Sequence, residues 1–203
     1  MARPFKPVFA CLLIAGCALP GHRGRSDVQF RGEAADPIGD TASAADARVP
    51  HPADLVYASV EVTDRELRFV VRFAPGSLDS STTAATFLLD TDIDSTSGVR
   101  GLGIGADYLL DLHAGPARGG TISRATAVNC SSPAVPCRYA PIQSLDIVLR
   151  NDGMEAVVPR ATLSPFGGRL NVRVIAYANL ERGRLTITTD HLPNLPAQFI
   201  TVR

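Results

Sequence analysis

The chain has 203 residues, with 20 basic and 20 acidic side chains and a formal net charge of zero. Such a balance produces no strong field of a single sign, so the sequence excludes a protein that binds nucleic acid or a membrane surface through charge. Hydrophobic residues make up 45% of the chain, which is enough to build the core of an independently folding domain.

The first 16 residues have the features of an export signal. Arg3 and Lys6 supply a positive head, and an almost wholly apolar run follows from Val8 to Ala15. This run is much shorter than the roughly 20 apolar residues that a membrane-spanning helix needs. A basic head, a short apolar stretch and a small-residue cleavage site predict a secretory signal peptide over residues 1–16.

The end of this segment, Ile14-Ala15-Gly16-Cys17, resembles the lipobox of bacterial lipoproteins. The resemblance implies that the chain is cut before Cys17 and that its thiol carries the lipid anchor. The alternative is an ordinary signal peptide that is cut elsewhere. We therefore expect an extracytoplasmic protein anchored to a bacterial membrane. Ala18 after the lipidated residue favours the outer membrane if the cell has two membranes.

Two further cysteines lie in the segment Cys130-Ser-Ser-Pro-Ala-Val-Pro-Cys137. In an exported protein, two thiols separated by six residues predict a small disulfide-closed loop. The alternative, half of a zinc site, lacks a second pair of cysteine or histidine ligands nearby. The predicted disulfide is a structural feature and indicates no activity.

The segment after Cys17 is rich in Ala, Gly, Arg and Asp and has little apolar periodicity. It predicts a flexible tether over residues 17–35, followed by one folded domain over residues 36–203. From Asp54 onward the pattern changes. Val56, Ala58, Val60 and Val62 alternate with more polar residues, as expected for a half-buried strand.

A second alternating run, Leu67 to Phe73, follows the turn Asp64-Arg65-Glu66 and predicts a hairpin with Arg68 and Arg72 facing outward. Further short strands are predicted over Ala84–Asp92, Asp107–His113, Leu145–Arg150, Met154–Val158, Leu170–Ala178 and Leu185–Thr189. The 15 prolines and 17 glycines punctuate these segments, and no apolar stripe of helical period is found. The sequence thus predicts an all-β domain, an antiparallel β-sandwich of the jelly-roll-like kind.

The densest polar motif is Asp90-Thr-Asp92-Ile-Asp94. Alternate residues of a strand share a face, so these carboxylates are expected to lie close together and to repel one another. A calcium ion, which accepts six to eight oxygen ligands in irregular geometry, would relieve this repulsion. The alternative is a solvated acidic loop whose aspartates cap turns. An EF-hand is excluded, because Ser95 stands where that loop needs glycine and Gly101 where it needs glutamate.

Several motifs occur in an order that resembles carbohydrate-binding module family 9-like and DOMON-like β-sandwich domains. They are Asp36-Pro-Ile-Gly-Asp40, Asp54-Leu55, Phe73-Ala-Pro-Gly76, Leu89-Asp-Thr-Asp92 and Gly105-Ala-Asp107-Tyr108. The resemblance implies a binding module with structural calcium in some members and a sugar or haem ligand in others. It adds Asp107 to the predicted calcium ligands Asp90, Asp92 and Asp94. It leaves open whether Asp36 and Asp40 belong to the same site.

The chain departs from the sugar-binding members of this family because it has no tryptophan on which a sugar could stack. Four tyrosines could substitute, namely Tyr57, Tyr108, Tyr139 and Tyr177. Haem is not expected, because Met154 is more typical of a core residue, and the histidines have no recognisable axial pattern. These are His22, His51, His113 and His191.

No catalytic motif is evident. Ser164 is not in a nucleophile-elbow sequence, and the clustered carboxylates Asp90 and Asp107 fit a metal site better than a glycosidase pair. Two hypotheses follow. The chain is either a non-catalytic binding module for carbohydrate or another envelope ligand, or a structural or interaction lipoprotein that has lost the ligand site.

Overall fold

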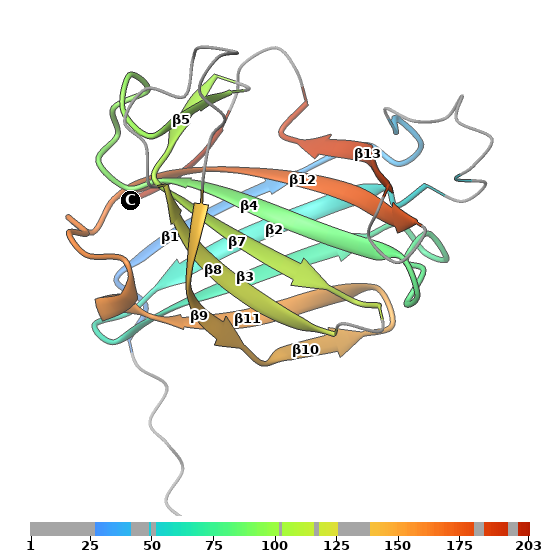
Figure 1. The fold of residues 1–203 in the computed structure, drawn as a ribbon, viewed down its shortest axis with the longest axis horizontal. Coiled ribbons are helices and arrows are strands. Elements are labelled where there is room, and N and C mark those ends of the chain that lie inside the picture. The colour runs from blue at the N-terminus through green and yellow to red at the C-terminus, as the bar shows by residue number, and fades with distance from the viewer. Residues whose placement is uncertain are drawn as a thin grey trace, which may run out of the picture.

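A computed structural model describes residues 27–41, 49, 52–101, 103–115, 118–125, 139–180, 185–194 and 199–203. Nearly all regular structure in these ranges is β-strand, and two antiparallel sheets pack face to face (Figure 1). The predicted all-β antiparallel sandwich is therefore confirmed.

The first sheet has five strands. Its order is β1 (Phe30–Ala35), β2 (Leu55–Val62), β3 (Glu66–Phe73), β11 (Gly153–Pro159) and β10 (Ile147–Arg150). The turn at Asn151 and Asp152 joins β10 to β11.

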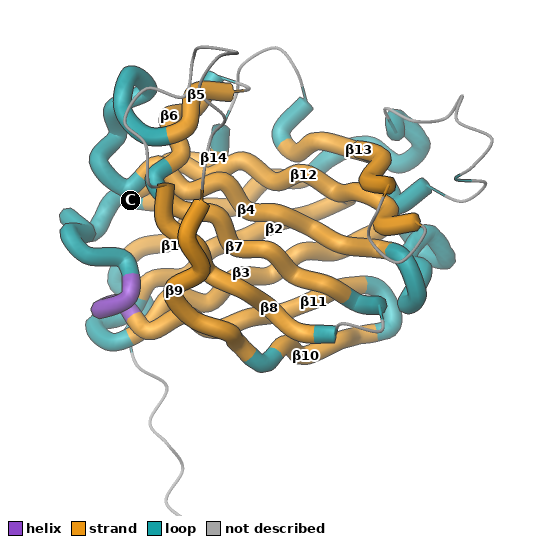
Figure 2. Tube along the Cα trace, in the orientation of Figure 1, coloured by secondary structure: helices purple, strands orange, loops and turns teal. Residues whose placement is uncertain are grey.

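The second sheet has seven strands. Its order is β13 (Leu185–Leu192), β12 (Leu170–Leu180), β4 (Thr83–Asp90), β7 (Tyr108–His113), β8 (Gly119–Ala125) and β9 (Tyr139–Leu145), with β14 (Ile200–Val202) also paired to β12. A small hairpin of β5 (Val99–Gly101) and β6 (Ile104–Ala106) lies beyond the end of β4. The 3₁₀-helix η1 (Arg160–Thr162) is the helical segment seen in Figure 2.

The core lies between the sheets and is built from the alternate residues of the strands. On β3, Leu67, Phe69, Val71 and Phe73 are buried in the core, while on the outer face Arg68 is exposed, Arg72 is half-buried and Val70 is covered. Phe69 meets Phe87 of β4 edge to face, with ring centroids 5.3 Å apart, so these aromatic rings pack one sheet against the other.

The first strand lies within the segment that the sequence assigned to the tether. Phe30–Ala35 pairs with β2 along its whole length, so the sandwich begins earlier than residue 36. The strand lacks apolar alternation, and Gly32 is the residue it buries. A Cβ added at Gly32 would lie 2.8 Å from the carbonyl oxygen of Thr201 in β14. Backbone pairing with β2 and the close approach of Gly32 to β14 therefore hold β1 in place. Neither interaction requires alternating hydrophobic residues, so neither produces a hydrophobic pattern in the sequence.

Other strand boundaries also differ from the prediction. The run Leu145–Arg150 is divided at Asp146, where the chain leaves β9 in one sheet and enters β10 in the other. The strand predicted over Ala84–Asp92 ends at Asp90. Strands β5, β6, β8 and β14 had no predicted counterpart, and β9, of which the prediction covered only Leu145, is largely exposed.

Candidate functional site

An acidic cluster lies where β4 ends, below the β5–β6 hairpin at the left of Figure 1. Asp90, Asp92 and Asp107 each place one carboxylate oxygen within 4.8 Å of the others. Asp90 is the last residue of β4 and is buried, Asp92 is exposed, and Asp107 directly precedes β7. The structure thus brings together three of the four carboxylates predicted to bind calcium.

Backbone and hydroxyl donors hold two of these carboxylates in place. The Thr91 N–H and hydroxyl both donate to Asp107 Oδ2, at 2.9 and 2.8 Å. The Ser97 hydroxyl donates to Asp92 Oδ2 at 2.9 Å. Asn171 of β12 approaches Asp90 Oδ2 at 3.4 Å, a long contact that leaves this buried carboxylate weakly compensated.

The fourth predicted ligand, Asp94, has a different role. Its N–H donates to Asp90 Oδ1 and Asp92 Oδ1, at 3.2 and 2.9 Å. Its own carboxylate accepts from the N–H and hydroxyl of Thr96, at 2.8 and 2.6 Å, and caps the next turn. Asp94 therefore shapes the loop through its backbone, as in the alternative interpretation of turn-capping aspartates, while the other three carboxylates converge.

The electrostatics of the cluster favour a cation. The pKa of Asp90 is raised to about 6, chiefly by burial and also by the carboxylates of Asp92 and Asp107, while the hydrogen bond from Asn171 lowers it. A positive ion among the three carboxylates would oppose both effects and lower the pKa of Asp90, because it stabilises the charged forms of the carboxylates. Their oxygens are hard ligands of the type that calcium and magnesium take.

Asp36 and Asp40 do not join this cluster. They gather with Asp190 of β13 in a second group of carboxylates. The question that the sequence left open is thereby answered, since the two acidic motifs of the chain lie at separate places in the sandwich.

The four tyrosines that could replace a sugar-binding tryptophan lie in different surroundings. Tyr108 is buried and donates to the carbonyl of Ser164. Tyr57 lies on the five-stranded sheet, where its hydroxyl donates to Glu33. Tyr139 begins β9 and is half-buried. Tyr177 lies half-buried on the outer face of the seven-stranded sheet, and this position makes it the candidate for contact with a ligand.

The outer face around Tyr177 carries a group of polar side chains that we call the polar face. It consists of Thr86, Asp111, His113, Tyr177 and Asn179, from the neighbouring strands β4, β7 and β12. Thr86 donates to Asp111, and the Asn179 amide lies 3.2 Å from His113 Nδ1. Burial raises the pKa of Tyr177 to about 12, and the nearby charge of Asp111 adds to the rise.

A pocket of about 360 Å³ continues from this polar face towards β8 and β9. It is lined by His113, Arg118, Gly119, Gly120, Thr121, Ser144, Leu145 and Asp146. The register places Thr121 opposite both Asp111 and Ser144, so the floor of the pocket and the polar face form one surface. The sequence shows Asp111 and His113 as outward residues of a strand. The sequence does not predict that β8 and β9 lie beside Asp111 and His113.

Met154 is fully buried in the core, where the sequence placed it. His113 belongs to the polar face, and the Nδ1 atom of His191 is buried.

Several predicted features lie outside the described residues, namely the signal at 1–16, Cys17, His22, His51, Cys130 and Cys137. Among the residues that are described, no helix has both the length and the apolar character to cross a membrane.

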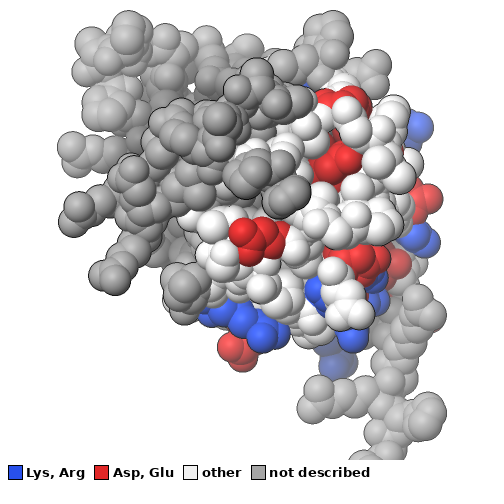
Figure 3. Space-filling view, turned by 90° about the vertical axis from the view of Figure 1, so that its right-hand side faces the viewer, with Lys and Arg blue, Asp and Glu red and all other residues white. Residues whose placement is uncertain are grey.

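Charges are scattered over the described surface. On the side of the molecule shown in Figure 3, acidic residues form separate small patches on a mostly uncharged surface, and the basic residues lie along its lower and right-hand margins. No protein-family model matches the chain, and a search of curated proteins gives no match.

Proposed function

We propose that this protein is a lipid-anchored extracytoplasmic binding module without catalytic activity, and that its ligand is a carbohydrate or another hydroxyl-rich component of the cell envelope. One observation carries the proposal. The polar face of the seven-stranded sheet adjoins a pocket of about 360 Å³ that is lined by hydroxyl, carboxylate, imidazole and guanidinium groups.

The chemistry of this surface suits a sugar. Thr121 and Ser144 can donate and accept hydrogen bonds, and Asp146 accepts them, so together they can satisfy a ligand that presents hydroxyls of both kinds. Tyr177 and His113, whose ring centroids are 6.3 Å apart, supply flat surfaces at the side of the pocket. The volume lies within the roughly 300–1,000 Å³ of small-molecule sites.

The cluster of Asp90, Asp92 and Asp107 completes the proposal as a structural calcium site. Its carboxylates converge on one point from a single loop region, as a shared cation requires. They do not face each other across the pocket, whose lining residues lie elsewhere on the sheet. This arrangement supports a stabilising ion and not a pair of catalytic acids.

The anchor and the location rest on the sequence motif that ends at Cys17. In this proposal the lipid at Cys17 attaches the chain to a bacterial membrane, with the outer membrane favoured, and the tether presents the sandwich in the extracytoplasmic space. The balanced charge argues against nucleic acid as a partner.

A second candidate is a structural or interaction lipoprotein that has no small-molecule ligand. The absence of tryptophan favours this second candidate. Without tryptophan, the polar face is left with Tyr177 as the principal aromatic side chain on which a sugar could stack. In this case the partner would be an envelope protein.

A glycan array probed with the full chain separates these candidates. We expect reproducible binding to a restricted set of glycans, and a loss of affinity of at least about fivefold in Tyr177→Ala, because truncation of an aromatic anchor typically costs more than 1 kcal/mol. Tyr57→Ala changes a tyrosine on the other sheet and is expected to bind as the wild type does. Absence of glycan binding would favour the structural lipoprotein, and equal binding by the two variants would show that the glycan binds away from Tyr177.

A further inference from the structure

The second acidic cluster spans the two sheets of the sandwich. Asp36 directly follows β1, Asp40 lies four residues later, and Asp190 belongs to β13 of the other sheet. Each offers a carboxylate oxygen within 4.8 Å of the others. In Figure 1, β13 lies at the side of the sandwich away from β5. Along β12, Asn171 pairs with Asp90 of the first cluster and Ala176 pairs with Asp190 of the second. Five residues of strand span about 17 Å, so the two clusters are separated by about that distance along the sheet.

A fourth carboxylate, that of Asp54, lies beside Asp36, and one of its two oxygens has no hydrogen-bond partner. Asp54, just before β2, is 5% exposed. Its Oδ2 accepts from the N–H of Gly39 at 2.7 Å, which directs the carboxylate at the loop between Asp36 and Asp40. Its Oδ1 is buried without a hydrogen-bond partner, and so is Oδ2 of Asp36. Buried carboxylate oxygens of this kind are costly unless a donor or a cation satisfies them.

Among the residues that the structure describes, the neighbouring side chains do not balance the negative charge. Asn194 donates from Nδ2 to Asp36 Oδ1 and Asp40 Oδ2, at 2.7 and 2.6 Å, but its amide is neutral. No arginine in the described part of the chain forms an ion pair with Asp36, Asp40, Asp54 or Asp190. Burial raises the pKa of Asp190 to about 7 and that of Asp36 to about 6, and their acidic neighbours add to both rises.

We propose that Asp36, Asp40, Asp54 and Asp190 bind a second divalent cation of the calcium type. Four carboxylates form a hard, all-oxygen ligand set, and calcium accepts such sets in irregular geometry with water completing the shell. Asp40 is exposed and gives the ion a route from solvent. Asp36 and Asp54 adjoin β1 and β2, whereas Asp190 lies in β13, so the ion clamps one sheet to the other. The Leu55 N–H already bridges the same boundary by donating to Asp190 Oδ2 at 2.7 Å.

Calcium titration of the chelator-treated full chain, in detergent and followed by calorimetry, tests this proposal. We expect the wild type to bind two equivalents. Asp36→Asn/Asp40→Asn is expected to lose one equivalent, and Asp90→Asn/Asp92→Asn to lose the other. Asp64→Asn changes an exposed carboxylate on the β2–β3 turn and is expected to retain both. If the first cluster binds no calcium, the wild type takes up one equivalent, and the change at Asp36 and Asp40 alone removes it.

Thermal unfolding separates loss of the site from loss of the fold. Without calcium, Asp36→Asn/Asp40→Asn relieves repulsion between carboxylates, so we expect its Tm in chelator to equal or exceed that of the wild type. Added calcium is then expected to raise its Tm by less than that of the wild type. The proposal is overturned if this variant binds as many equivalents as the wild type, if calcium raises both Tm values equally, or if magnesium fills the site in preference to calcium.

Discussion

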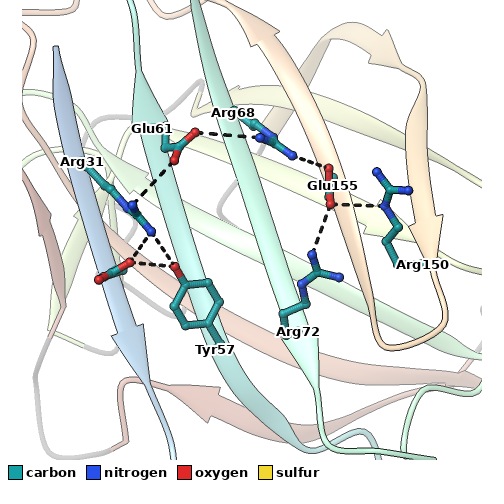
Figure 4. A network of polar contacts seen from close by, with 8 residues as sticks. Arg31, Tyr57, Glu61, Arg68, Arg72, Arg150 and Glu155 are labelled. Atoms are coloured by element: carbon teal, nitrogen blue, oxygen red, sulfur yellow. Dashed lines mark hydrogen bonds and ion pairs between the residues drawn. The ribbon is translucent and has the colours of Figure 1, made fainter. Parts of the chain in front are cut away.

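At the scale of single residues, Glu155 of β11 organises the outer face of the five-stranded sheet (Figure 4). Arg68, Arg72 and Arg150 all contact its carboxylate, with Arg68 Nη2 the nearest at 2.8 Å. Glu155 lies opposite Val70 on β3, so Arg68 and Arg72 flank it diagonally. Their long side chains cover the carboxylate and leave it 9% exposed. The hydrogen bond from Arg68 holds the pKa of Glu155 below its ordinary value.

We predict that Glu155→Gln lowers the free energy of unfolding by about 1–2 kcal/mol at pH 7, because three half-exposed arginines lose their shared carboxylate. The folded pKa lies below the ordinary value of 4.5. This stabilisation is therefore present above about pH 4.5 and disappears as the pH falls through the folded pKa. Denaturant unfolding at several pH values measures it. Glu33→Gln, in an exposed pair with Arg31, is expected to have a smaller effect, and a constant difference across acid pH would contradict the role of the Glu155 carboxylate.

At the scale of elements, the β5–β6 hairpin supports the loop that carries Asp92. Gly98 has a φ of 57°, and a side chain there would meet the carbonyl of Ala106. A Cβ at Gly105 would press on the carbonyl of Asp94 and lie 2.7 Å from that of Ser97. The glycine-rich stretch from Gly98 to Gly105 thus permits close backbone packing under the acidic loop.

Gly105→Ala is expected to destabilise the protein by about 1–3 kcal/mol, as overpacking of a tight contact does. It should also weaken stabilisation by calcium, because displacement of the loop moves Asp92 away from Asp90. Thermal unfolding with and without calcium measures both effects. Gly167→Ala is the matched control, since its Cβ would meet nothing within 4 Å. Wild-type stability and calcium response in Gly105→Ala would show that the loop tolerates the displacement.

At the scale of the whole molecule, the association of the two sheets depends on residues from both. Phe69, Phe87, Leu110, Val158 and Val174 are completely buried and come from five strands of the two sheets. A small domain has a net stability of only about 5–15 kcal/mol, so one large gap in this layer removes much of it.

Phe87→Ala is expected to cost about 3–5 kcal/mol, the typical cost of a large-to-small change in a core, because it also removes the edge-to-face contact with Phe69. Phe199→Ala changes a ring that is 41% exposed and is expected to shift stability by less than about 1 kcal/mol. The midpoints of denaturant unfolding compare the two variants, and equal costs would mean that Phe87 does not hold the sheets together.

Much of the fold was predictable because strand periodicity is local. The alternation from Leu67 to Phe73 depends on neighbouring residues alone, and the structure buries the expected face. Edge strands such as β1 and β9 were missed for the same reason, since they bury few side chains and are held by backbone pairing. The division of Leu145–Arg150 at Asp146 depends on which sheet each half joins, and the neighbouring residues contain no pattern that indicates the sheet.

By itself, then, the sequence determined the strands of the sandwich and the acidic loop at Asp90 and Asp92, because each strand and the loop depend on a few consecutive residues. Tertiary structure decided which carboxylates meet. It placed Asp107, which the family resemblance had predicted, beside Asp90 and Asp92 and turned the Asp94 carboxylate away, since the register of β4 and the loop backbone fix those positions. It also joined Asp36 and Asp40 to Asp190, about 150 residues later in the chain. Such contacts depend on how two sheets stack, and sheet stacking is a property of the whole chain.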